Sequence, residues 1–118
     1  GADPWEGRSF YVQVERCRGT EDKVSVRLDE EKYARCARAL KDAIEEFFGG
    51  AVPVEVIDVP TLYAMEVRTM PQEMHPKANG RACIAEQAEA AGGRTIWSKV
   101  RCKKWPRVAD VLQEIQEF

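Results

Sequence analysis

The sequence predicts a single α/β domain in which helices pack on a sheet. Runs of β-forming residues with alternating apolar positions are interspersed with two longer segments of helical periodicity. The 118 residues are 44% hydrophobic and 32% charged, an ordinary balance for one domain with its own core. We therefore expect one α+β sandwich over residues 9–118, with residues 1–8 as an N-terminal tail or cloning remnant.

The N-terminal half is predicted to hold two strands and a long helix. The runs at 9–16 and 23–28 alternate in polarity and are joined by a turn, so they are expected to form a hairpin. Asp29 is a favourable N-cap, and a helix is predicted over residues 30–48. Its apolar residues follow the helical repeat: Tyr33, Cys36, Ala37, Leu40, Ile44, Phe47 and Phe48.

The C-terminal half is predicted to hold three more strands and two helices. The strands are expected at 52–58, 61–68 and 94–101, a short helix at 81–91, and the last helix from Pro106 onward. Thr69 to Gly80 is expected to be a loop because it contains Pro71, Pro76 and Asn79-Gly80.

The charge pattern and the short motifs exclude several classes of function. The net charge is -2, from 18 basic and 20 acidic residues, so no overall field attracts nucleic acid or an anionic membrane. No apolar run reaches the roughly 18 residues that a membrane span needs. There is no glycine-rich phosphate loop and no Ser/His/Asp pattern, and one histidine among scattered cysteines predicts neither a metal site nor a cofactor.

The four cysteines suggest disulfides, although no two are close enough to form a Cys-x-x-Cys motif. Pairs Cys17–Cys36 and Cys83–Cys102 would each close a loop of nineteen steps, a gain of about 3 kcal/mol in the loop-entropy account. Cys17–Cys102 is the rival pairing. Two disulfides would indicate a secreted protein or an oxidising organelle rather than the cytoplasm.

Two stretches carry a family resemblance. Residues 59–67, VPTLYAMEV, and residues 93–100, GRTIWSKV, followed by Trp105-Pro106, are similar to the selenoprotein W-like (Rdx-type) family of thioredoxin-like proteins. The first stretch also resembles the segment after the cis-proline loop of thioredoxins. The likeness covers residues 23–68 and 93–118, and it implies a thioredoxin-like fold with residues 5–22 as an extension and 69–92 as an insertion.

The chain departs from the family at the redox motif, which the family places between its first strand and first helix. If 23–28 is that strand, the motif position falls on 28–31, LDEE, which has no sulfur. This alignment is preferred because the helix cap then follows directly. If the strand is instead the run before Cys17, then Cys17 takes the first cysteine position and Thr20 the second.

The chain resembles the family but lacks its redox motif at the preferred position. This combination favours a non-catalytic, thioredoxin-like protein-interaction domain that is stabilised by disulfides. The insertion 69–92 is expected to carry specificity for a protein or peptide, since long loops on a rigid scaffold usually carry binding. On this interpretation, a sheet edge is also expected to bind the partner. The candidate binding residues are Pro60, Thr61, Met70, Met74 and His75.

Two alternatives stay open. The first is a selenoprotein W-like thiol-disulfide oxidoreductase, in which Cys17 attacks and Cys36 or Cys102 resolves the mixed disulfide. The second is a protease-prodomain-like or inhibitor module, which a split βαβ topology would support. Trp97 and Trp105 are expected to be core or interface anchors, and Arg101, Lys103 and Lys104 a solvated turn.

Overall fold

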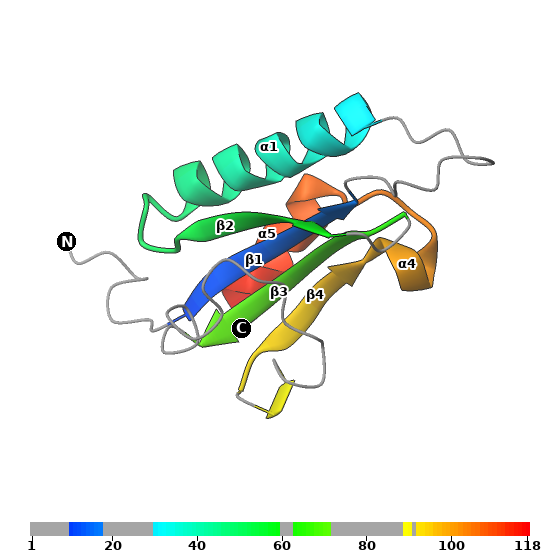
Figure 1. The fold of residues 1–118 in the computed structure, drawn as a ribbon. Coiled ribbons are helices and arrows are strands. Elements are labelled where there is room, and N and C mark those ends of the chain that lie inside the picture. The colour runs from blue at the N-terminus through cyan, green and yellow to red at the C-terminus, as the bar shows by residue number, and fades with distance from the viewer. Residues whose placement is uncertain (1–9, 18–29, 60–62, 72–88, 91) are drawn as a thin grey trace.

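The computed structural model of the chain contains a four-stranded mixed sheet covered by helices (Figure 1). It describes residues 10–17, 30–59, 63–71, 89–90 and 92–118. The elements are β1 (Phe10–Cys17), α1 (Glu30–Phe47), β2 (Val54–Val59), β3 (Met65–Pro71), β4 (Arg94–Ser98), α4 (Lys99–Cys102) and α5 (Val108–Glu117). The predicted mixed α/β class is confirmed. None of the helices in these ranges is long and apolar enough to cross a bilayer.

The strand order is compatible with a thioredoxin-like arrangement. The sheet runs β2-β1-β3-β4, with β1 and β2 parallel and the other two pairs antiparallel. The parallel strands β1 and β2 are direct neighbours, whereas a split βαβ unit has another strand between them. This topology removes the structural argument for the prodomain-like alternative.

The hairpin predicted between 9–16 and 23–28 is not formed, because β1 already has a partner on each side. It pairs with β2 along Val12–Cys17 and with β3 along Phe10–Arg16. Residues 23–28 themselves lie outside the described residues. Both alignments to the resembling family therefore stay open.

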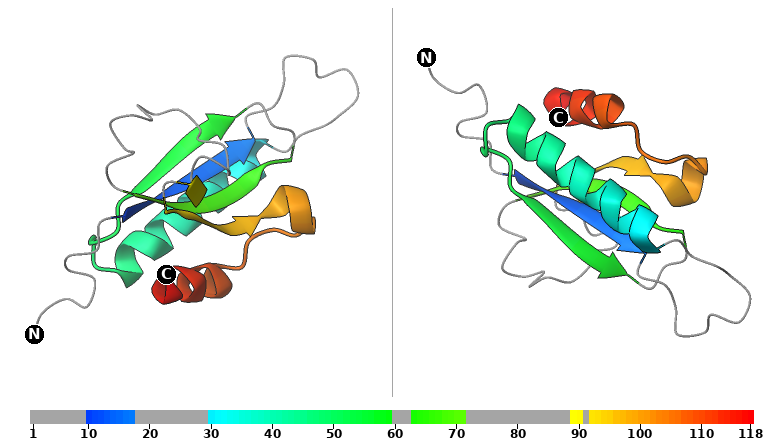
Figure 2. Two further views of the ribbon diagram at one scale, coloured as in Figure 1. Left: turned by 90° about the horizontal axis from the view of Figure 1, so that it is seen from below. Right: turned by 90° about the horizontal axis from the view of Figure 1, so that it is seen from above.

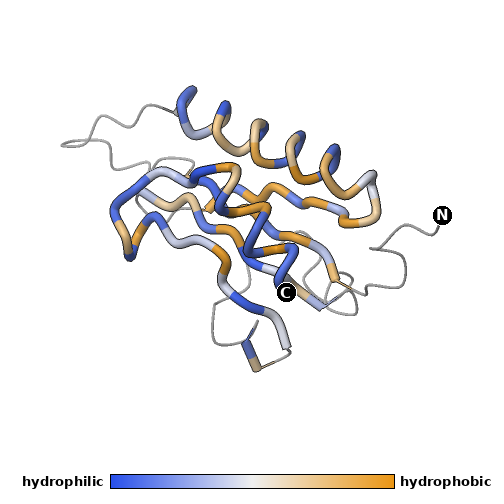
Figure 3. Tube along the Cα trace, turned by 180° about the vertical axis from the view of Figure 1, so that it is seen from behind, coloured by the Kyte–Doolittle hydropathy of each residue, from blue (hydrophilic) through white to orange (hydrophobic). Residues whose placement is uncertain are grey.

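The core lies between the sheet and two helices that cover one of its faces. Figure 2 shows α1 and α5 on the same side of the sheet, and Figure 3 shows the apolar side of α1 turned toward the strands. The buried side chains of α1 are Tyr33, Ala37, Leu40 and Ile44, and Phe48 is buried directly after the helix; each is at most 4% exposed. Val111 and Ile115 of α5 belong to the same core. The predicted helix is thus confirmed, and so is its packing face except at Phe47, which is 49% exposed.

The strand predicted at 61–68 begins and ends later than expected. β3 spans Met65–Pro71, and both Thr69 and Met70 are fully buried. The reason is tertiary, because Phe10 of β1 pairs with Pro71 and Val12 with Thr69. The predicted loop and insertion therefore cannot start at Thr69, and a deletion of 69–92 would remove the end of a core strand. Of the helix predicted at 81–91, only residues 89–90 are described, and they are helical.

The other face of the sheet carries polar side chains that are also buried. Gln13 lies opposite Arg68 and Glu15 opposite Glu66, and all four are at most 8% exposed. The Arg68 guanidinium donates a hydrogen bond to the Glu15 carboxylate. Burial raises the pKa of Glu15 above its ordinary value; the charge of Arg68 opposes this shift and that of Glu66 adds to it. The sheet therefore depends on a buried ion pair as well as on its apolar face.

Candidate functional site

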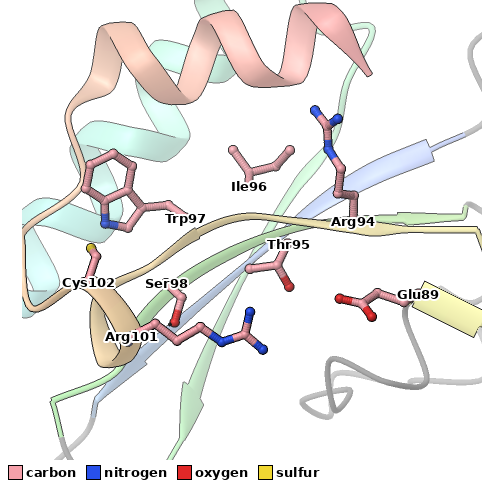
Figure 4. Close-up of a pocket in the computed structure, with 8 residues that line it drawn as sticks. All are labelled: Glu89, Arg94, Thr95, Ile96, Trp97, Ser98, Arg101 and Cys102. Atoms are coloured by element: carbon pink, nitrogen blue, oxygen red, sulfur yellow. Dashed lines mark hydrogen bonds between the residues drawn. The ribbon is translucent and has the colours of Figure 1, made fainter.

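A pocket of about 390 Å³ lies along β4 (Figure 4). Because β4 is the last strand in the sheet order, it pairs only with β3 within the described residues. The pocket is lined by Glu89, Arg94, Thr95, Ile96, Trp97, Ser98, Arg101 and Cys102. An edge strand beside an open pocket is a place where an extended peptide can add to a sheet.

A β-bulge decides which side chains of β4 face which way. Trp97 lies opposite Val67 and Thr95 opposite Arg68, so Ile96 is an extra residue on β4. Ile96 and Trp97 consequently both point to the side of α5, whereas Thr95 points to the other side (Figure 4). The pocket thus has an apolar wall and a polar wall on either side of one strand.

The short helix α4 is built on the buried carboxylate of Glu66. Ser98 is its N-cap: the Ser98 hydroxyl accepts from the Arg101 backbone N–H at 3.2 Å and donates to Glu66 Oε1 at 2.5 Å. Glu66 Oε2 accepts from the backbone N–H groups of Lys99 at 2.8 Å and Val100 at 3.4 Å. The predicted strand therefore ends at Ser98 rather than three residues later, because Glu66 of β3 satisfies the helix start.

The chain after α4 is fixed by hydrogen bonds to backbone carbonyls. Lys103 adopts a left-handed conformation (φ 64°) and its N–H donates to the Lys99 carbonyl at 2.8 Å. The Trp97 indole N–H donates to the Lys104 carbonyl at 3.0 Å, and the Cys102 thiol donates to the same carbonyl at 3.7 Å. These contacts hold Cys102 in place in the lining of the pocket.

The polar wall presents groups that a ligand can satisfy. The side chains of Arg101 and Glu89 point toward one another from either side of Thr95 (Figure 4). The Thr95 hydroxyl oxygen is buried and has no hydrogen-bond partner among the residues that the structure describes. An unmade hydrogen bond at a buried polar group costs about 1–3 kcal/mol, so a ligand that supplies one gains that energy.

The ammonium of Lys99, by contrast, already forms hydrogen bonds and cation–π contacts with aromatic residues. Its ammonium donates to the Tyr33 hydroxyl at 3.0 Å and to the Tyr63 carbonyl at 3.3 Å. It also lies over the rings of Tyr33, Tyr63 and Trp105, at 5.1, 5.5 and 4.7 Å from their centroids. Trp105 packs against the core, as expected for an anchor. Lys99 therefore ties the start of α4 to these aromatic residues, and its ammonium is not available to bind a ligand in the pocket.

The candidate cysteines differ widely in accessibility. Cys17 is 1% exposed and belongs to the apolar core, so its thiol does not face solvent. Cys36 is half-buried; burial raises the pKa of its thiol, although the charges of Lys32 and Lys99 oppose this. Cys102 is exposed. An attacking thiolate needs solvent access, which among these three only Cys102 clearly has.

The predicted disulfides are not formed in this structure. Cys17, Cys36 and Cys102 carry free thiols, and Cys83 lies outside the described residues. The pairings Cys17–Cys36, Cys83–Cys102 and Cys17–Cys102 therefore stay predictions.

Of the other predicted site residues, the structure describes only Met70. Pro60, Thr61, Met74 and His75 lie outside the described residues. Met70 is fully buried in β3, so it does not lie on a loop where a partner would contact it. In the part of the chain that the structure describes, no group of His, Cys, Asp and Glu is placed to hold a metal ion.

The pocket was not evident from the sequence. Arg101 was expected in a solvated turn, and nothing in the alternation of residues 94–98 reveals the bulge that separates Thr95 from Trp97. One signal was present, because serine is a preferred N-cap and Ser98 begins α4.

Comparison with known proteins adds no assignment to this geometry. No family model, no curated protein and no solved structure matches the chain. The function must therefore be argued from the pocket itself.

Proposed function

We propose that this chain is a non-catalytic protein-interaction domain of thioredoxin-like type that binds an extended segment of a partner protein along β4. The observation that carries the proposal is the 390 Å³ pocket beside an edge strand. Main-chain hydrogen bonds to an edge strand supply affinity, and side-chain pockets beside the strand supply specificity. The segment after Pro71 remains a predicted contributor to specificity.

The frame of the pocket supports binding because it is held before any ligand arrives. Glu66 and Ser98 fix the start of α4, and Trp97 fixes the chain beyond it. A preorganised surface loses less conformational entropy on binding than a mobile one. Thr95 and Arg101 then offer polar groups to an incoming backbone or side chain.

The direct test is to fill the pocket with a large side chain and to measure peptide binding. The probe is a fluorescent peptide of about ten residues with alternating valine and glutamine, a pattern suited to strand addition. We expect Cys102→Trp to weaken its binding by about tenfold or more, because the indole occupies the space that the peptide needs. Cys102→Ser is the matched control and should bind as the wild type does. Fluorescence anisotropy measures both affinities.

Both variants should fold normally, since Cys102 is exposed and surface substitutions change stability by only about 0.5 kcal/mol. Thermal unfolding monitored by circular dichroism checks this. If the tryptophan variant binds the peptide as tightly as the serine variant, the pocket is not the binding site. If the wild-type protein does not bind the peptide at all, the proposal of strand addition fails.

Thiol-disulfide exchange through Cys17 is the second candidate. One observation favours it: β1, the parallel neighbour of β2, ends at Cys17, where the resembling family has its first motif cysteine. The 1% exposure of Cys17 works against it, because the attacking sulfur must reach its substrate.

Alkylation separates the two candidates. We expect iodoacetamide to modify Cys102 quickly, Cys36 more slowly, and Cys17 only after unfolding, in the order of their exposure. Mass-spectrometric peptide mapping with and without reduction follows each thiol. A Cys17 that reacts as fast as Cys102 would support the oxidoreductase. Two disulfides engaging all four cysteines would instead support the predicted oxidising compartment.

A further inference from the structure

The cations at the two ends of β4 differ in number and in whether they form ion pairs. Arg94, at one end of β4, forms an ion pair with Glu114 of α5 at 3.3 Å. At the other end, Arg101, Lys103 and Lys104 are all exposed, and none of them forms an ion pair with a described residue. Three positive charges therefore lie within four consecutive positions, on and just after α4, and no described carboxylate forms an ion pair with any of them.

These cations stand on a fixed backbone. The N–H of Lys103 is bonded to the Lys99 carbonyl, and the carbonyl of Lys104 accepts from both Trp97 and Cys102. Lys103 keeps a positive φ of 64°, an uncommon conformation for a residue with a side chain, because these contacts impose it. Charges presented from a rigid backbone select a partner more sharply than charges on a mobile loop.

The carboxylate that lines the pocket lies on the other side of Thr95 from Arg101. Glu89 faces Arg101 across Thr95, so negative charge is repelled at the Glu89 end and attracted at the α4 end (Figure 4). The pocket thus has an electrostatic direction along β4. A bound strand gains most when its own charges follow that direction.

We infer that the partner segment is an acidic peptide whose Asp or Glu side chains lie at the α4 end and contact Arg101, Lys103 and Lys104. This inference rests on the proposed strand addition at β4 and names the chemistry of its partner. The polar backbone of the segment lies along Thr95, while its carboxylates supply the ion-pair partners that these three cations lack within the described residues.

The test uses three peptides that differ only in charge. The neutral Val-Gln peptide is compared with versions in which three glutamines near one end are replaced by glutamate or by lysine. We expect the glutamate peptide to bind about tenfold more tightly than the neutral one and the lysine peptide to bind more weakly. The preference for glutamate should shrink in about 1 M salt, where the screening length falls to about 3 Å.

Charge reversal identifies the residues responsible. In the variant Arg101→Glu/Lys103→Glu/Lys104→Glu, we expect the order of the three peptide affinities to invert, so that the lysine peptide binds most tightly. The matched control is Arg35→Glu/Arg38→Glu/Lys41→Glu on α1, which changes the net charge by the same amount. Arg38 and Lys41 line a different pocket of about 340 Å³, so this control also tests whether the peptide binds there.

The outcomes separate this inference from the proposal on which it rests. If the neutral peptide binds in a way that Cys102→Trp abolishes, but the glutamate peptide binds no more tightly, the strand-addition site stands and its acidic preference is wrong. If the α1 control changes the order of the peptide affinities as much as the α4 variant does, the preference for the glutamate peptide reflects net charge. The inference is then overturned. If no peptide binds, both ideas fall together.

Discussion

Replacing Arg68 with methionine is expected to destabilise the protein by about 3–5 kcal/mol at neutral pH. Arg68 and Glu15 form a buried ion pair whose side chains are each 9% exposed. Without the guanidinium, the Glu15 carboxylate is left charged and buried on the polar face of the sheet, with Glu66 opposite it in the strand register. Urea denaturation monitored by circular dichroism measures the loss.

The stability lost in the Arg68→Met variant should become smaller as the pH falls. Burial holds the pKa of Glu15 above its ordinary 4.5, and the charge of Arg68 counteracts part of that shift. A carboxyl with a raised pKa in the folded state contributes stability below its ordinary pKa, and this contribution is lost as the pH rises through the folded value. Removing Arg68 raises that folded value further, so the variant should recover toward wild-type stability near pH 4.5.

The double variant Glu15→Gln/Arg68→Met is the control for this interpretation. It removes both charges, and replacing a whole buried ion pair is often close to neutral in stability. We expect it to be more stable than Arg68→Met alone at neutral pH, with a weaker pH dependence. A single variant whose stability loss is small and independent of pH would show that Glu15 does not depend on Arg68.

Truncating Phe48 to alanine should cost about 3–5 kcal/mol, whereas the same change at Phe47 should cost less than about 1 kcal/mol. Phe48 is 1% exposed in the core and Phe47 is 49% exposed. The two rings contact each other at 4.9 Å between centroids, so both variants lose that contact and only one opens a cavity. Equal losses in chemical denaturation would contradict the placement of Phe48 in the core.

The main helix shows how much local sequence can predict. Residues 30–48 were expected to be helical from their apolar spacing, and α1 spans Glu30–Phe47. The same spacing placed both Phe47 and Phe48 on the apolar side. Only the packing of α1 against the sheet shows that Phe48 is buried and Phe47 is not.

The strands show where local reasoning failed. β3 extends to Pro71 although prolines and a polar segment suggested a loop from Thr69, because Phe10 and Val12 of a distant strand pair with its last residues. Likewise, β1 was expected to form a hairpin with 23–28, yet β2 and β3 occupy its two sides. Strand ends and partners depend on residues far away in the chain, which a local pattern does not contain.

The candidate pocket depends even more on such distant contacts. Ser98 and Lys99 were recognised within a family-like stretch, but Glu66 of another strand is what turns them into the start of α4. The bulge beside Ile96 arises from the register between β3 and β4 and sends Thr95 and Trp97 to opposite walls. None of these features has a signature within β4 alone.

The sequence by itself determined the fold class, the position of α1 and the absence of a Cys-x-x-Cys motif, because periodicity and spacing are local properties. The tertiary structure alone decided the strand order, the burial of Cys17 and Met70, and the pocket along β4. The physical reason is that register, burial and edge exposure result from pairing between segments that are distant in the chain. The burial of Glu15 with Arg68, 53 residues apart, is the clearest case.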